Sequence, residues 1–202
     1  MAFYVVMFII ISAVISFPII FLIHELGHLI CGLITGYRLI YFEILGIGLY
    51  FGNKKKKIMR RRNMPPGQCL MYPLNINNRP YLMIVGGSVL NIAVGTVFLI
   101  ISMSCGLYFF ILFFMLGTLS IILGLSNLFG KSPTCDGRAF FECVRDVRDM
   151  AAFNNIMLIA KDIENGIAIK DMPDRYFVIC GNVNNSSIAA EINEFAVMHK
   201  NN

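Results

Sequence analysis

Charge is scarce in this chain. Only 14 % of its 202 residues are charged, against 57 % that are hydrophobic, and no charged residue lies between Tyr81 and Gly130. A chain with so little charge lacks the surface of a soluble globular protein, so its composition predicts an integral membrane protein. At a rise of ~1.5 Å per residue, the uncharged segment is long enough to cross a bilayer twice, with a turn expected near Ser104-Cys105-Gly106.

The N-terminal segment lacks the marks of a cleaved signal peptide. Ala2 to Ile23 has no basic start and no small-residue cleavage site, and it continues directly into further apolar sequence. We therefore expect a retained span, formed by one long helix over residues 3–35 with a kink at Pro18. Together with spans at about 81–104 and 107–130, this predicts three transmembrane helices in a multi-pass protein of the cell membrane.

Basic residues are missing from the Met1 end and from the turn at Cys105, and they concentrate in the loop after the first span. This loop holds Arg38, Lys54 to Lys57 and Arg60 to Arg62. The positive-inside rule therefore places loop 37–80 and the C-terminal tail in the cytoplasm, and the N-terminus outside. Because no aromatic residues interleave the basic run, a solvated or lipid-facing charge run is favoured over a nucleic-acid site. We expect the lipid bilayer as a partner and no nucleic acid.

Closely spaced cysteine pairs are absent as well. The six cysteines include no C-x-x-C pair, and Cys69, Cys135, Cys143 and Cys180 fall on the predicted cytoplasmic side. Thiols stay reduced in that compartment, so we expect no disulfide bonds. Cys31, in the first span, is expected to be a small apolar residue of its helix rather than a metal ligand.

Loop 37–80 does not have the pattern of a helix. The run from Tyr37 is rich in aromatic and β-branched residues, is interrupted by Gly46, Gly48 and Gly52, and turn-forming residues follow the basic run. This pattern predicts a small membrane-associated β-hairpin or sheet. Its free strand edge could accept an unwound substrate, and a plain amphipathic hairpin on the membrane surface explains the same pattern equally well.

The chain becomes polar beyond residue 137. Apolar residues at helical spacing before Gly166, and Ser186 or Ser187 in position to cap a last helix, predict a small cytoplasmic helical tail. The expected fold class is therefore a mainly α membrane protein. It has a transmembrane core over residues 1–137, which includes the β-rich loop, and a helical tail over residues 138–202.

Histidine is rare, yet two of the three histidines fall in one short motif. His24-Glu25-Leu26-Gly27-His28 is an H-E-x-x-H run inside the first apolar span. On a helix this spacing puts two imidazoles on one face with a carboxylate beside them, which offers zinc two nitrogen ligands and a general base. Such groups are costly in lipid, so they predict a polar cavity that water enters from the cytoplasm.

Zinc needs a third protein ligand, and the candidates are Glu43 and Asp136. Asp136 is the better candidate, because Pro133 and Gly137 bracket it in an irregular turn that can direct its carboxylate into the helix bundle. The third histidine, His199, is expected to be a surface residue of the tail.

Three motifs together resemble the site-2-type intramembrane zinc metalloprotease family, in a minimal bacterial form. The HELGH run matches the family's H-E-x-x-H. The segment Gly87 to Asn91 resembles its G-P-x-x-N, with Ser88 in place of the proline. The segment Asn127 to Arg138 resembles its N-x-x-P-x-x-P-x-D-G-x-R, with one extra residue before the aspartate and without the first proline. The motifs follow the family's order, and the likeness covers about residues 15–140.

The resemblance implies a three-helix metalloprotease core that hydrolyses peptide bonds. The ligands of Zn²⁺ would be His24, His28 and Asp136. Glu25 would take a proton from the zinc-bound water and pass it to the leaving amine. Asn91 or Asn127 would donate to the developing oxyanion, or would instead make interhelical hydrogen bonds.

The implied substrate is a membrane-spanning or membrane-associated peptide or protein, such as a peptide precursor or a regulatory factor. No inserted extracytoplasmic peptide-binding domain is expected, which favours a small substrate or one delivered by a partner, and a regulatory partner or a homo-oligomer is left open. Two other classes compete: a non-catalytic membrane partner that binds or escorts a peptide, and a metal transporter. Glu25 favours the hydrolase, because binding alone needs no general base.

Overall fold

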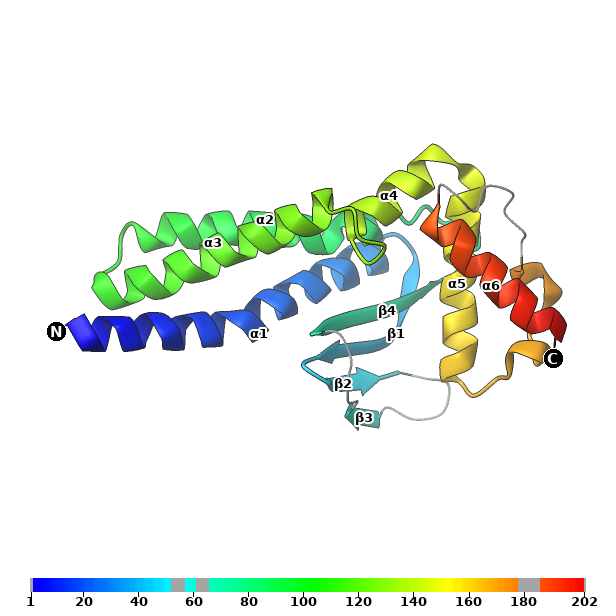
Figure 1. Ribbon diagram of the computed structural model, residues 1–202, viewed down its shortest axis with the longest axis horizontal. Helices are drawn as coiled ribbons and strands as arrows, with labels where there is room; N and C mark the ends of the chain where they lie inside the picture. The colour runs from blue at the N-terminus through cyan, green and yellow to red at the C-terminus, as the bar shows by residue number, and fades with distance from the viewer. Residues whose placement is uncertain (1, 52–56, 61–65, 178–185, 202) are drawn as a thin grey trace.

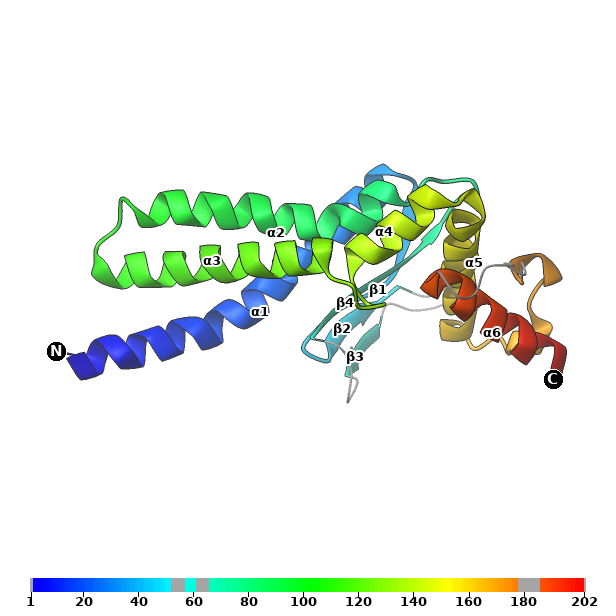
Figure 2. The ribbon, with the colours of Figure 1, turned by 45° about the horizontal axis from the view of Figure 1, so that its top comes forward.

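The computed structural model describes residues 2–51, 57–60, 66–177 and 186–201. Three long helices lie together, and a small sheet and the C-terminal helices gather at the end of this bundle opposite the N-terminus (Figures 1 and 2). This is the mainly helical architecture that the sequence predicts. Some residues named above for the basic run, the glycines and the cysteines lie outside the described residues: Gly52, Lys54 to Lys56, Arg61, Arg62 and Cys180.

The three long helices are α1 (Ala2–Ile34), α2 (Tyr81–Ser102) and α3 (Leu107–Phe129). Each is long and apolar enough to cross a membrane. Their outward side chains are large and apolar, such as Phe3, Ile100 and Phe109, and a surface of this kind suits lipid rather than water. The prediction of three membrane-length helices is confirmed.

The helices α2 and α3 form a hairpin whose turn at Met103–Gly106 is the predicted one. Their backbones approach closely, because a Cβ on Gly95 would lie 2.8 Å from the Gly117 carbonyl oxygen. Small residues allow such close contact between membrane helices. The helix α1 changes direction along its length (Figure 2), and Pro18 lies inside it.

The sheet contains β1 (Tyr37–Ile44), β2 (Ile47–Tyr50), β3 (Lys57–Arg60) and β4 (Gly67–Pro73). The strands are antiparallel in the order β3-β2-β1-β4. Leu45 and Gly46 join β1 to β2 with positive φ angles of 51° and 78°, as the tight two-residue turn of a hairpin requires. The described part of loop 37–80 thus forms the small sheet that the sequence predicts.

The C-terminal part contains α4 (Asp136–Arg145), α5 (Val147–Glu164), the 3-10 turns η1 (Ile169–Asp171) and η2 (Asp174–Tyr176), and α6 (Ser187–Asn201). Asp146 separates α4 from α5 and caps α5 by accepting a 2.8 Å hydrogen bond from the Arg148 N–H. Ser186, one of the two predicted caps, accepts from the Ala189 N–H at 3.1 Å. The predicted boundary after residue 137 falls inside α4, and the division into two domains stays a prediction.

The helix α5 packs on the sheet and on the loop before α2. Asn154 accepts a 2.7 Å hydrogen bond from the Tyr37 hydroxyl and donates at 2.8 Å to the carbonyls of Ile76 and Asn78. A buried apolar cluster also runs from Tyr37 to Ile156 of α5. These contacts hold α5 against β1 and the loop before α2, and α5 also contacts β4.

His199 has more partners than a plain surface residue would have. Its Nδ1 lies 2.8 Å from the Ile169 carbonyl oxygen, its Nε2 lies 2.9 Å from Asp174 Oδ1, and its ring stacks on Phe177 with centroids 4.1 Å apart. His199 is thus a half-buried residue of the tail with defined partners, which the expectation of a surface histidine did not include. Through these contacts His199 connects α6 to η1 and η2.

Candidate metal centre

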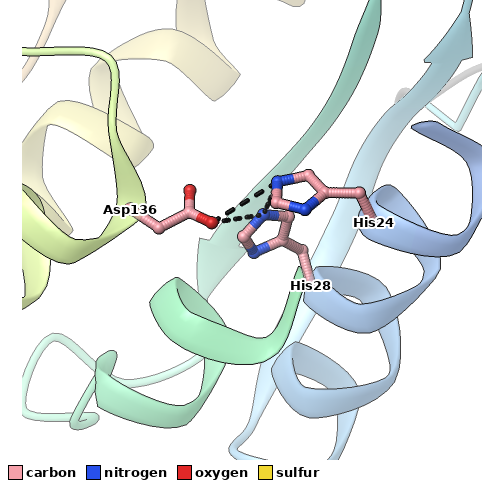
Figure 3. Close-up of side chains that lie close together, drawn as sticks. All are labelled: His24, His28 and Asp136. Carbon is pink, nitrogen blue, oxygen red and sulfur yellow. Dashed lines mark hydrogen bonds and ion pairs between the residues drawn. The ribbon is translucent and has the colours of Figure 1, made fainter. Parts of the chain in front are cut away.

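His24, His28 and Asp136 meet at one point of the structure (Figure 3). The two histidines lie one turn apart on α1, and their Nε2 atoms are 3.1 Å apart. Asp136 is the first residue of α4, and its Oδ2 lies 3.4 Å from His24 Nε2 and 3.5 Å from His28 Nε2. Two distant parts of the chain thus contribute one compact group of donor atoms.

The spacing of these atoms suits a single metal ion. Atoms that bind one ion tetrahedrally at about 2.05 Å lie about 3.3 Å from each other. The observed separations of 3.1, 3.4 and 3.5 Å scatter around that value. His24 is buried, whereas His28 and Asp136 are half-buried. The three residues can therefore hold a metal ion.

The histidine rings are held by partners on α2. His28 Nδ1 lies 2.8 Å from the Met83 carbonyl oxygen, which can only accept a proton, so Nδ1 carries the hydrogen and Nε2 keeps a lone pair for a metal. His24 Nδ1 lies 3.3 Å from Asn91 Nδ2. Asn91 Oδ1 is buried and has no hydrogen-bond partner among the described residues. With its amide turned so that Oδ1 accepts from His24 Nδ1–H, Asn91 would fix His24 in the same tautomer.

The carboxylate of Asp136 is also held. Ser88 Oγ donates a 2.9 Å hydrogen bond to Asp136 Oδ2. Burial raises the pKa of Asp136, and the nearby His28 and the Ser88 hydrogen bond oppose that shift only in part. A cation between the three side chains would offset the cost of this buried charge.

The helices α1 and α2 are in close contact around the imidazole rings of His24 and His28, with no space for a side chain at the glycines between them. A Cβ on Gly87 would lie 2.8 Å from His24 Cε1 and would press on His28 Nε2. A Cβ on Gly27 would in turn collide with the Gly86 backbone. Glycine at these positions sets how close α2 comes to the metal group.

Glu25 faces a cavity of about 580 Å³ that includes the metal group. Its carboxylate lies against β4, where a Cβ on Gly67 would be 2.7 Å from Glu25 Oε1 and the Cys69 N–H is a hydrogen-bond donor to the carboxylate. The pKa of the Cys69 thiol is raised, chiefly by burial and then by the nearby Glu25 carboxylate. The thiol therefore stays protonated. On the far side, Phe153 and Met157 of α5 complete the lining.

The two asparagines of the sequence motifs both reach His24. Asn127 Nδ2 lies 3.0 Å from His24 Nε2, on the side of the metal group, whereas Asn91 contacts Nδ1 on the far side of the ring. Asn91 also joins helices, because its backbone carbonyl accepts a 2.9 Å hydrogen bond from Ser120 of α3.

The other acidic candidate, Glu43, is not part of the group. It lies on β1 opposite Gln68 of β4, and its buried Oε1 has no hydrogen-bond partner among the described residues. Two hydrogen-bond partners of the metal group were not predicted from the sequence. One is the Met83 carbonyl, which is a backbone group and leaves no mark in the sequence. The other is Ser88, which was noted only because it replaces the proline of a motif.

The structure thus contains three membrane-length helices and a His-His-Asp group able to hold a metal ion. Comparisons with protein families, with curated proteins and with solved structures gave no match.

Proposed function

We propose that this chain is an intramembrane zinc metalloprotease that cleaves a membrane-spanning or membrane-associated peptide or protein. The observation that carries the proposal is the His24–His28–Asp136 group at tetrahedral spacing, beside Glu25, in a cavity next to membrane-length helices. Two imidazoles and a carboxylate form a donor set that suits zinc and leaves a coordination position open. Bound there, zinc would supply Lewis-acid polarisation of a scissile carbonyl.

Glu25 is the proposed general base. It is buried and lines the same cavity as the metal group. Its carboxylate would accept a proton from the attacking water and deliver it to the nitrogen of the leaving amine as the C–N bond breaks. The Cys69 N–H would hold the carboxylate in place between these two transfers.

The two asparagines would have different tasks. Asn127 points an amide nitrogen at the metal side of His24, so it is the proposed donor to the developing oxyanion. Asn91 contacts the far side of the ring and is the proposed positioning residue for His24.

Substrate would bind as an extended strand. The strand β4 stands at one end of the described strand order, and Gly67 to Met71 line the cavity. A peptide added to the free edge of β4 would expose its carbonyls to the metal group, whereas a helical peptide keeps them hydrogen-bonded. This favours a substrate segment that unwinds at the membrane surface, with the sheet and the C-terminal helices in the cytoplasm and the N-terminus outside.

The experiment compares the membrane and secreted peptides of cells that carry wild type, Glu25→Gln or Glu194→Gln. Glu194 is exposed on α6, so Glu194→Gln is a matched control for loss of one carboxylate. Fragments shared by wild type and control but missing with Glu25→Gln would support proteolysis and identify the cut bond. Identical peptide sets, with all three proteins expressed and loaded with zinc, would refute the proposal.

A further inference from the structure

A second cavity lies where α3 ends and α4 packs beside it, apart from the metal group. Its volume is about 430 Å³, and its lining comes from the end of α3, the loop that follows and α4. The lining combines aromatic and cationic side chains: Phe129, Phe141, Lys131, Arg138 and Arg145. We call it the α3–α4 cavity.

The aromatic side chains of this cavity face outward. Phe129, the last residue of α3, is 69 % exposed, and Phe141 of α4 is 59 % exposed. Val144, three residues after Phe141 on α4 and so on the same side of the helix, is also exposed. Because Phe129 ends a membrane-length helix, this surface continues the one that lipid chains would cover.

The cationic side chains flank that apolar surface. Arg138, Phe141 and Arg145 are spaced i, i+3 and i+7, so they share one face of α4. Arg138 is held by Glu142 Oε1 at 2.8 Å and by the Lys131 carbonyl at 3.0 Å. Lys131 and Arg145 are exposed.

Glu142, the carboxylate of this lining, is directed into the protein. It accepts hydrogen bonds from Ser187 Oγ at 2.9 Å and from the Ile188 N–H at 3.1 Å, both at the start of α6. Its charge faces Arg138 at 2.8 Å. The lining thus contains three cationic side chains, Lys131, Arg138 and Arg145, and one carboxylate, that of Glu142. Positive charge therefore exceeds negative charge in the lining, although Asp146 and Asp149 lie near Arg145.

We propose that the α3–α4 cavity binds an anionic phospholipid of the surrounding membrane. The headgroup phosphate would accept hydrogen bonds from Lys131, Arg138 and Arg145, and an acyl chain would lie against Phe129 and Phe141. Basic pockets at the ends of membrane helices suit anionic headgroups, because charge attraction adds to the apolar contact. The inference rests on the membrane-length helices and is independent of the proposed protease function.

The test offers the purified full-length chain equal amounts of phosphatidylglycerol and phosphatidylcholine with the same acyl chains. Native mass spectrometry then counts the lipids retained. We expect wild type to retain phosphatidylglycerol preferentially. Each basic residue near a membrane surface changes binding by roughly fivefold, so the double variant Lys131→Gln/Arg145→Gln should lower this preference at least tenfold.

The matched control is Lys170→Gln/Arg175→Gln, which removes two exposed positive charges of the tail outside the cavity. It should keep the wild-type preference, as should the charge-conserving pair Lys131→Arg/Arg145→Lys. Equal preferences in the two neutralised variants, or no preference in wild type, would overturn the proposal.

The apolar half of the site has its own test. Phe141→Ser leaves the charge unchanged and should lower retention of phosphatidylglycerol, and inorganic phosphate at the lipid concentration should not displace the lipid. Unchanged retention in Phe141→Ser, together with displacement by inorganic phosphate, would assign the cavity to a soluble anion and overturn the lipid assignment.

Discussion

Ser88 Oγ donates a 2.9 Å hydrogen bond to Asp136 Oδ2, so α2 holds the carboxylate that completes the His24–His28 group. Ser88 is fully buried and lies 48 positions before its partner in the chain. The motif that the sequence resembles has proline at this position, and proline has no side-chain donor. In this chain Ser88, which replaces that proline, therefore forms a hydrogen bond with the candidate metal ligand Asp136.

Loss of that hydrogen bond should weaken metal binding. Ser88→Ala is expected to lower zinc affinity at least tenfold while the fold persists, because partners that orient a ligand commonly contribute factors of 10 to 100. Competition with a chromophoric chelator measures the affinity. Ser126→Ala on the exposed side of α3 serves as control, and a wild-type affinity for Ser88→Ala would show that Ser88 does not position Asp136.

The third ligand can be tested by two variants that remove one charge each. Asp136→Asn should abolish stoichiometric zinc, since the carboxylate oxygen lies 3.4 and 3.5 Å from the two imidazoles. Glu43→Gln should keep it, because Glu43 lies on β1 outside the group. Metal analysis of the purified proteins measures the zinc content of each variant. Zinc lost in Glu43→Gln and kept in Asp136→Asn would make Glu43 the ligand.

A methyl group on Gly87 should disturb both histidines. Its Cβ would lie 2.8 Å from His24 Cε1 and would press on His28, so Gly87→Ala should lose zinc and roughly 1–3 kcal/mol of stability through overpacking. Gly106→Ala at the α2–α3 turn meets nothing within 4 Å. It should match wild type in metal content and in thermal unfolding. Normal zinc binding in Gly87→Ala would contradict the close contact of α2 with the rings.

The docking of α6 should depend on pH through Glu142. Burial alone would raise the pKa of Glu142, but hydrogen bonds from Arg138, Ser187 and Ile188 outweigh it and hold the pKa below its ordinary value. A carboxyl with a lowered pKa stabilises the folded state fully above its unfolded pKa of about 4.3, and this contribution is lost as pH falls through the folded pKa.

Glu142→Gln should therefore loosen α6 by about 2 kcal/mol at neutral pH. The difference in α6 docking stability between Glu142→Gln and wild type should shrink as the pH falls below about 4. Hydrogen exchange of α6 at a series of pH values measures both effects. Glu194→Gln, on the exposed face of α6, should behave as wild type, and a pH-independent difference for Glu142→Gln would rule out its titration as the cause.

Several elements could be predicted because their signals are local. Long uncharged runs predicted the membrane-length helices, Ser186 predicted the start of α6, and Gly166, with a φ of 81°, marks the end of α5 as expected. The break at Asp146 was not predicted, because apolar residues keep a helical spacing on both sides of it. The strand order was also out of reach, since β1 pairs with β4 across two intervening strands.

By itself, the sequence determined three apolar spans and the placement of His24, Glu25 and His28 on one helix, because hydropathy and helical spacing depend only on neighbouring residues. Only the tertiary structure decided that Asp136 closes the group, that Ser88 holds it, and that β4 and α5 form the cavity walls. Those arrangements depend on how elements far apart in the chain pack together. A side chain at Gly87 would collide with both imidazoles, so the close packing of α2 on α1 is one arrangement on which the His24–His28–Asp136 group depends.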